Sequence, residues 1–214
     1  MVDEKGLGED VYYLPHHGVY KNTTGPKKLR IVFDSAAIYR GSSLNDALFC
    51  GPSLLNQLPC VLMGFREQEV AFTADIEAMF SRIRLRPEDA RRHLLLWHDE
   101  SGSEVIYKMD RLTFGDTCSP YVAIETVRRV ATDHGQGEPE AVDAILKKLY
   151  MDDYLDSTPT VEEAITRAKT VQRILAEGDF HLRKWLSNSQ QFIEAVDPGS
   201  SMNVSYSLMS DNET

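Results

Sequence analysis

The segment Leu149-Tyr150-Met151-Asp152-Asp153-Tyr154-Leu155 places two adjacent carboxylates between bulky apolar residues. The run Asp156-Ser157-Thr158-Pro159 follows, and the two runs together predict a β-hairpin with the Asp pair at its tip. A hairpin tip can direct both carboxylates to one point, where they can hold Mg²⁺ together with substrate phosphates. The alternative is a plain polar turn, because Asp is common in turns for local reasons.

The tetrapeptide Tyr150-Met151-Asp152-Asp153 resembles the metal-binding signature of reverse transcriptases, and this resemblance implies a third carboxylate at the end of an upstream hydrophobic strand. The run Val70-Ala71-Phe72-Thr73-Ala74 alternates in a way that suits a short buried strand, and Asp75 follows it directly. Asp75 and Asp152 are 77 residues apart (152 − 75), so only the fold can bring them together. The sequence therefore predicts that the Asp75 strand lies beside the Asp152–Asp153 hairpin.

Length and composition indicate a globular chain. Its 214 residues suffice for one or two domains, and 42% hydrophobic with 26% charged residues is typical of globular proteins. No run approaches the roughly 18 apolar residues of a membrane span, and the N-terminus lacks the apolar core of a secretion signal. Cys50, Cys60 and Cys118 are odd in number and lack zinc-ligand spacing, which favours reduced thiols in an intracellular, cytoplasmic protein.

The net charge of −10 counts against a nucleic-acid partner, because binding a phosphate backbone normally requires an electropositive surface. The positive charge is unevenly placed, however, in two groups: Lys21, Lys27, Lys28, Arg30 and Arg40, then Arg82, Arg84, Arg86, Arg91 and Arg92. Metal-binding carboxylates also add to the negative total but are neutralised when occupied. The net charge weakens a nucleic-acid interpretation without excluding it.

The N-terminal part predicts an edge strand or extended arm over 11–20, a turn over 22–26 and a strand over 27–34. Lys28 and Arg30 near such a turn can clamp a triphosphate, or can be ordinary solvated charges. His16 and His17 are adjacent in an extended segment, so their side chains point to opposite faces and a shared metal is not expected.

The rest of the chain mixes strands and helices, which predicts an α+β fold rather than a doubly wound sheet. We expect a near-helical segment at 52–65 broken by Pro59, and short helices at 77–83 and from Pro87. Paired strands are expected at 93–97 and 105–109. His93 and His98 are expected to be strand residues rather than metal ligands. Further on we expect a helix capped by Ser119 and running to 133, a helix at 138–146, a Thr160-capped helix to 177, a strand at 180–185 and an unfolded tail at 197–214.

With these residues in view, the chain resembles the reverse transcriptase of BEL/Pao-type long-terminal-repeat retrotransposons over about residues 11–195. The resemblance is carried by several spaced motifs in order: Tyr13-Leu14-Pro15-His16-His17, Leu29-Arg30-Ile31-Val32-Phe33-Asp34-Ser35-Ala36, Ser43-Leu44-Asn45-Asp46 with Gly51-Pro52, Thr73-Ala74-Asp75-Ile76-Glu77, Thr113-Phe114-Gly115, Tyr150-Met151-Asp152-Asp153 and Leu182-Arg183-Lys184-Trp185-Leu186-Ser187-Asn188.

The resemblance implies a right-hand polymerase with an antiparallel palm sheet packed on helices. It assigns 11–66 and 85–111 to a fingers-like part and 67–84 and 112–196 to the palm, with disordered tails at 1–10 and 197–214. Nothing after residue 196 resembles a thumb, and a ribonuclease H region is missing. The chain is therefore expected to be a fingers-and-palm fragment of a retrotransposon polyprotein.

The resemblance also implies a set of site residues, a cofactor and partners. The expected cofactor is a pair of Mg²⁺ ions, with Mn²⁺ as an alternative, and the expected partners are deoxynucleoside triphosphates and an RNA or DNA template with its primer. The resemblance assigns metal binding and catalysis to Asp75, Asp152 and Asp153, and proton donation to the leaving pyrophosphate to Lys184. The implied nucleotide contacts are Lys28 and Arg30 for the triphosphate, Phe80 for exclusion of a ribose 2′-hydroxyl, and Phe114 and Gly115 for the nucleotide itself. Tyr150 and Met151 are expected near the primer end.

Two other functions compete with an active polymerase. A catalytically inactive relic or domesticated nucleic-acid-binding module with the same fold is favoured by the missing downstream segments and the net acidity. An unrelated metal-dependent phosphotransferase or nuclease would explain the three acids but not the other motifs.

Overall fold

The computed structural model describes residues 11–21 and 28–199. The turn expected at 22–26, the tail expected at 1–10 and nearly all of the tail expected at 197–214 lie outside the described residues. No described helix is long and apolar enough to cross a membrane.

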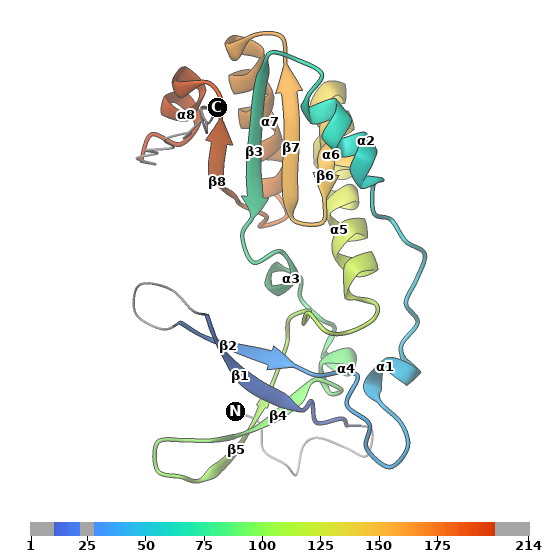
Figure 1. Cartoon of the computed structure of the whole chain (residues 1–214). Coiled ribbons are helices and arrows are strands. Elements are labelled where there is room, and N and C mark those ends of the chain that lie inside the picture. The colour runs from blue at the N-terminus through green and yellow to red at the C-terminus, as the bar shows by residue number, and fades with distance from the viewer. Residues whose placement is uncertain (1–10, 22–27, 200–214) are drawn as a thin grey trace, which may run out of the picture.

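The centre of the molecule is a four-stranded antiparallel sheet with the order β6-β7-β3-β8 (Figure 1). Its strands are β3 (Val70–Ile76), β6 (Leu149–Tyr150), β7 (Asp153–Thr158) and β8 (Leu182–Ser187). Buried and half-buried residues alternate along β3, as expected for a strand with one face on the core. The predicted hairpin and the predicted Asp75 strand are therefore both confirmed, and they are neighbours.

Helices pack against this sheet and bury one of its faces (Figure 1). They are α2 (Leu58–Phe65), α5 (Ser119–His134), α6 (Pro139–Lys148), α7 (Val161–Ala176) and α8 (Gln190–Val196). The long helices are amphipathic, with small or branched residues such as Ala123, Val127, Ala164 and Ala168 fully buried. The small side chains let the helices approach the sheet closely, which fixes the sheet's position.

An aromatic cluster joins the sheet to α8. Phe72 on β3 stacks on Phe192 with ring centroids 4.7 Å apart, and Tyr154 and Trp185 pack edge-on at 6.4 Å from each other. All four rings are buried, so this cluster contributes a large share of the apolar area removed from water.

Two hairpins form the other end of the molecule (Figure 1). The first pairs β1 (His16–Lys21) with β2 (Lys28–Phe33), and the second pairs β4 (Leu94–His98) with β5 (Glu104–Lys108). Three short helices accompany them: α1 (Leu44–Ala47), α3 (Met79–Arg82) and α4 (Pro87–Ala90). A small separate core of Leu14, Phe33, Leu44 and Leu95 holds this end together.

Some local expectations were wrong. The segment before Leu58 is not helical, and Pro59 lies in the first turn of α2, where proline is tolerated because its missing N–H has no intrahelical partner. Cys118 rather than Ser119 is the N-cap of α5, because the Ser119 hydroxyl bonds to the carbonyl of Thr113 instead. Helix α2 contacts β7, β6 and α6, and the division of the chain into fingers-like and palm parts stays a prediction.

Candidate active site

The three predicted carboxylates meet at one end of the sheet. Asp75, the next-to-last residue of β3, is the register partner of Asp153, the first residue of β7. Asp152 lies in the turn that joins β6 to β7, and its carbonyl accepts a 2.8 Å hydrogen bond from the backbone N–H of Ile76. The fold therefore brings together residues that are far apart in the sequence.

The turn that presents the Asp pair has an uncommon backbone. Met151 has a φ of 54°, in the left-handed region that costs a residue with a side chain about 1–2 kcal/mol. Such conformations persist only where the surrounding structure imposes them, and they cluster at functional sites. The turn is thus held in a specific shape by its position between paired strands.

The carboxylates repel one another. Burial raises the pKa of Asp153, and the negative charges of Asp152 and Asp75 raise it further, while Lys184 acts in the opposite direction. Clustered carboxylates destabilise their own charged forms unless a cation lies among them. The negative charges at this end of the sheet therefore favour the binding of a cation.

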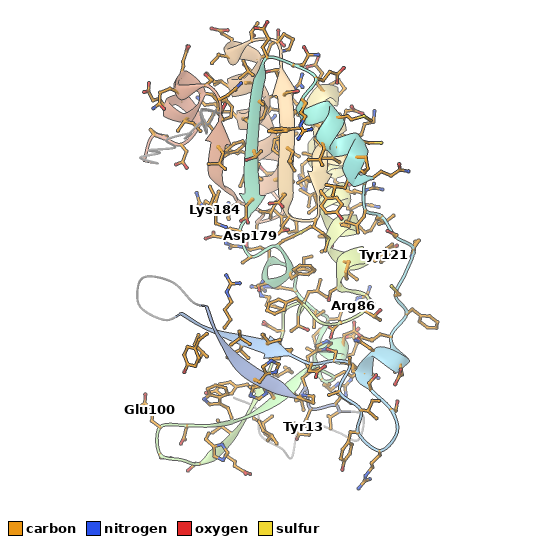
Figure 2. The ribbon with its side chains drawn as sticks, in the orientation of Figure 1. Tyr13, Arg86, Glu100, Tyr121, Asp179 and Lys184 are labelled. Atoms are coloured by element: carbon orange, nitrogen blue, oxygen red, sulfur yellow. The ribbon has the colours of Figure 1, made fainter. Side chains whose placement is uncertain are left out.

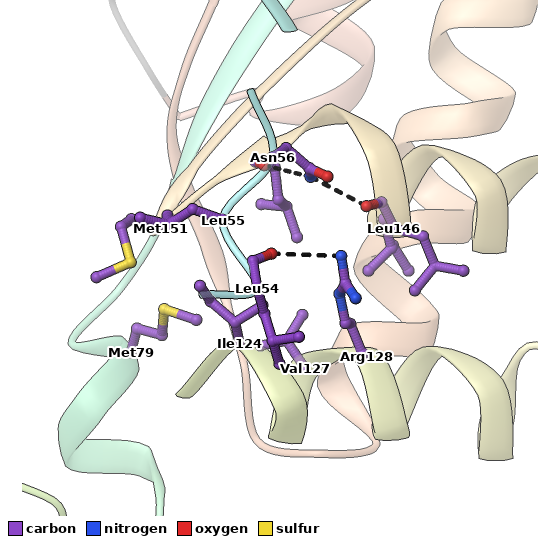
Figure 3. Close-up of a pocket in the computed structure, with 11 residues that line it drawn as sticks. Leu54, Leu55, Asn56, Met79, Ile124, Val127, Arg128, Leu146 and Met151 are labelled. Carbon is purple, nitrogen blue, oxygen red and sulfur yellow. Dashed lines mark hydrogen bonds between the residues drawn. The ribbon is translucent and has the colours of Figure 1, made fainter. Parts of the chain in front are cut away.

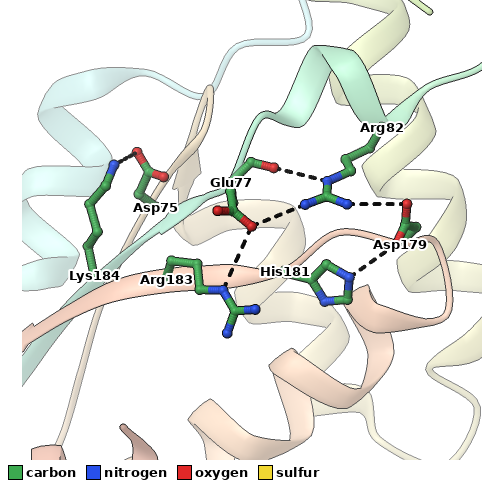
Figure 4. A network of polar contacts seen from close by, with 7 residues as sticks. All are labelled: Asp75, Glu77, Arg82, Asp179, His181, Arg183 and Lys184. Carbon is green, nitrogen blue, oxygen red and sulfur yellow. Dashed lines mark hydrogen bonds and ion pairs between the residues drawn. The ribbon is translucent and has the colours of Figure 1, made fainter. Parts of the chain in front are cut away.

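Lys184 supplies a cation here. Its Nζ lies 3.1 Å from Oδ2 of Asp75, and it lies at the end of the sheet that faces the hairpins (Figures 2 and 4). The β3–β8 register shifts between Thr73 and Asp75, and Lys184 has a φ of 56°. A bulge of this kind redirects a side chain, and here it accompanies the turn of Lys184 toward Asp75.

The residues present suit a divalent metal, although no three His, Cys, Asp or Glu side chains in the described part of the chain already stand as a metal-binding cluster. Carboxylate oxygens are the ligands that Mg²⁺ prefers, and one of them, Oδ2 of Asp75, is paired with the Lys184 ammonium. Because the Lys184 side chain is 75% exposed, its ion pair is screened by water and easily exchanged.

A second polar network supports the same end of the sheet (Figure 4). Arg82 on α3 bonds to Glu77 at 3.1 Å and to Asp179 at 3.5 Å, and His181 also contacts Asp179 at 3.1 Å. Arg183 lies 3.8 Å from Glu77. The network ties α3, which carries Phe80, to the segment that enters β8.

A pocket lies behind the hairpin and is lined partly by Met79 and Met151 (Figure 3). The loop before α2 closes one side of it, because Asn56 donates to the carbonyls of Leu146 and Leu149 at 3.0 and 2.8 Å. These bonds attach the loop to the base of the hairpin that carries the Asp pair.

The predicted nucleotide residues lie on β2, on α3 and on the loop between β5 and α5. Gly115 has a φ of 114°, and a Cβ there would lie 2.9 Å from the carbonyl oxygen of Phe33, so only glycine fits against β2. Phe114 is half exposed, and Phe80 is partly buried on α3. Arg30 is exposed on β2, and β3 points toward the part of the molecule that holds β2 (Figure 1). Within the described part of the chain, Arg30 forms no hydrogen bond or ion pair with the three carboxylates, and the side chain of Lys28 lies outside that part.

Sequence reasoning missed a buried polar group next to the Phe114–Gly115 loop. His93, treated as a strand residue, precedes β4 and pairs with Asp116 at 2.8 Å, with both side chains buried. Nothing in the spacing of these residues indicates the pair.

Solved structures match the fold, whereas no family model and no curated protein matches the sequence. The foamy viral protease-reverse transcriptase dRH in complex with dsDNA has a TM-score of 0.60 at 19% identity, covering 79% of this chain and 26% of that one. The same enzyme with an RNA/DNA hybrid gives 0.58 at 18% identity (81% and 20%), and the native prototype foamy virus enzyme gives 0.57 at 21% (79% and 20%).

The fold is therefore that of the palm and fingers of a reverse transcriptase-like polymerase, as the sequence predicted. The chain spans only about a fifth to a quarter of the length of these three solved chains. At these identities the likeness establishes the architecture, and the chemistry must be argued from the residues of this chain.

Proposed function

We propose that this chain is the fingers-and-palm core of an RNA-directed DNA polymerase of the BEL/Pao retrotransposon type. The single observation that carries the proposal is the pairing of Asp75 with Asp153 at the end of the palm sheet, with Asp152 in the adjoining turn. The polymerase-like fold supports it, and the ordered motifs of the sequence favour the BEL/Pao type.

Asp75, Asp152 and Asp153 would hold two Mg²⁺ or Mn²⁺ ions. Such a pair, when bound, activates the primer 3′-hydroxyl and stabilises the attacking and leaving oxygens of an in-line displacement. Lys184, whose Nζ lies 3.1 Å from Oδ2 of Asp75, would donate a proton to the leaving pyrophosphate. Tyr150 and Met151 border the carboxylates and would lie against the primer end.

The fingers-side residues would hold the incoming nucleotide. Arg30 and Lys28 on β2 contact the triphosphate, with Arg30 suited to it by its planar fork of donors. Phe114 and Gly115 form a surface against the nucleotide base and sugar. Thumb and ribonuclease H regions of a longer polyprotein would supply the remaining grip on the template and primer.

Single-nucleotide incorporation tests this function. The purified chain, at high concentration of a DNA-primed RNA template, is expected to add the templated deoxynucleotide with Mg²⁺ and to add none with EDTA. Measuring one addition removes the need for processivity. Template binding without any incorporation, in either Mg²⁺ or Mn²⁺, would favour the second candidate function, an inactive nucleic-acid-binding module with the same fold.

Phe80 gives a prediction about sugar selection. Phe80→Val removes the ring that would lie against the ribose 2′ position, so the preference for deoxynucleotides over ribonucleotides is expected to fall by roughly 10–200-fold, the range for one added or missing group in a pocket. The measurement is the ratio of kcat/KM for the two nucleotides. Phe49→Val changes a ring that is 95% exposed and outside the candidate site, and its ratio should equal that of the wild type. An unchanged ratio in Phe80→Val would remove Phe80 from the nucleotide site.

A further inference from the structure

One buried carboxylate, that of Asp116, bonds to three segments at the end of the molecule that the two hairpins form. Asp116 accepts hydrogen bonds from the Ser35 hydroxyl, from His93 Nε2 at 2.8 Å and from the Thr113 hydroxyl at 3.0 Å. All four residues are 5% exposed or less. Ser35 follows β2, His93 precedes β4, and Thr113 lies on the same loop as Asp116, so the cluster joins both hairpins to that loop.

The two side chains at the centre of this cluster, His93 and Asp116, each favour the charged form of the other. Burial by itself would lower the pKa of His93, but the hydrogen bond and charge of Asp116 outweigh it and raise the pKa above its ordinary value. Burial likewise opposes ionisation of Asp116, yet the bonds from His93 and Ser35 lower the pKa of its carboxyl overall. Removing one partner of a buried charged pair leaves the other uncompensated, which is far more costly than losing an exposed ion pair.

The cluster brackets the Phe114–Gly115 loop. Thr113 and Asp116 stand directly before and after these two residues. Asn45 braces the loop from the other side, since its amide donates to the Gly115 carbonyl at 3.0 Å and its Oδ1 accepts from the Thr117 N–H at 2.9 Å. The loop therefore has two independent attachments.

We propose that His93 is a positioning residue which, through Asp116, holds the Phe114–Gly115 loop in the conformation that meets an incoming nucleoside triphosphate. The identity of the ligand rests on the proposed function. The attachment of the loop rests on the bonds of the cluster alone, so the two parts can fail separately. His93 lies inside the protein and acts only through Asp116, so it touches no substrate.

Three variants at His93 separate its two hydrogen bonds. The Nδ1 atom pairs with the Asp89 carbonyl at 3.2 Å, and the Nε2 atom pairs with Asp116. The amide nitrogen of Gln reaches about as far as Nε2, and that of Asn about as far as Nδ1. His93→Gln can therefore keep the bond to Asp116, His93→Asn can keep only the bond to Asp89, and His93→Ala keeps neither.

Hydrogen–deuterium exchange measures the loop without requiring activity. Amides of residues 114–117 are expected to exchange about tenfold faster in His93→Ala and His93→Asn, the equivalent of one lost charge-assisted hydrogen bond, while His93→Gln stays near the wild type. Amides of β3 and β7 should not change. Binding of a deoxynucleoside triphosphate to the complex with primed template, measured with Ca²⁺ to prevent turnover, is expected to weaken about tenfold in the same two variants.

Asp156→Asn is the matched control, because Asp156 is also a fully buried carboxylate, bonded to the Tyr154 hydroxyl at 2.9 Å and close to Arg167 and Lys148. It should lower the stability of the palm without a selective change in residues 114–117 or in nucleotide affinity. Equal amide exchange of the loop in His93→Ala and in the wild type would overturn the proposal. Exchange in His93→Asn as slow as in His93→Gln would overturn it too. The two parts of the proposal can also give different results. If the wild-type chain binds no nucleotide, the proposed function is overturned. If amide exchange of the loop is still faster in His93→Ala, the role of His93 in positioning the loop stands.

Discussion

Asp152→Asn is expected to reduce nucleotide incorporation by roughly 10³-fold or more, the scale on which removal of a group that stabilises the transition state acts. Asn keeps the size of the side chain and can still form the turn between β6 and β7, because Asn is at home in turns. It removes a negative charge from the position where Asp75 and Asp153 converge. The loss should therefore be chemical rather than structural. Single-turnover incorporation with saturating primed template measures it.

Asp143→Asn is the control for this change. Asp143 is an exposed residue of α6, where it forms a 2.6 Å ion pair with Lys147 one helical turn away. Its loss is expected to leave incorporation unchanged and to alter stability by about 0.5 kcal/mol or less. Equal activities of Asp152→Asn and the wild type would rule out the assigned chemistry even if the chain polymerises.

Phe72→Ala is expected to lower the free energy of unfolding by about 3–5 kcal/mol. Phe72 is wholly buried on β3 and packs on Phe192, Tyr154 and Trp185 with ring centroids 4.7, 6.0 and 6.4 Å away. Truncation leaves a cavity between the palm sheet and α8 that rigid neighbours fill only in part. Against a typical total of about 5–15 kcal/mol, such a loss would unfold a large fraction of the chain under mild conditions.

Urea unfolding followed by tryptophan fluorescence measures this loss, since Trp185 belongs to the same cluster. Phe49→Ala is the matched truncation on the surface, where the ring is 95% exposed, and a change within about 0.5 kcal/mol is expected. A cost for Phe72→Ala as small as that of Phe49→Ala would mean that the aromatic cluster does not stabilise the palm.

The sequence predicted the palm well because its elements have strong local signals. The alternation of Val70, Phe72 and Ala74 identifies β3, and the Asp pair between apolar runs identifies the hairpin. Thr160 accepts from the Glu163 N–H at the start of α7, as its capping sequence predicts. Such features depend on neighbouring residues, which is why the sequence alone reveals them.

Contacts between distant residues that no recognisable motif marks could not be predicted. The contact between Lys184 and Asp75 joins positions 109 residues apart, and it depends on a bulge and a positive φ that nothing in the local sequence demands. The pairing of His93 with Asp116 depends on how the hairpins and the loop pack together. Helix α8 was not predicted, because seven residues hold too few turns for a periodic pattern.

Metal binding tests most directly whether Asp75 and the Asp152–Asp153 turn form one site. The measurement is uptake of Mn²⁺ by the purified chain, followed by the loss of the electron paramagnetic resonance signal of free Mn²⁺, which needs no template and no turnover. Saturable uptake is expected in the wild type and in Asp143→Asn, and strongly weakened uptake in both Asp75→Asn and Asp152→Asn. Uptake by Asp75→Asn and Asp152→Asn equal to that of the wild type would contradict a shared metal site and the polymerase function built on it.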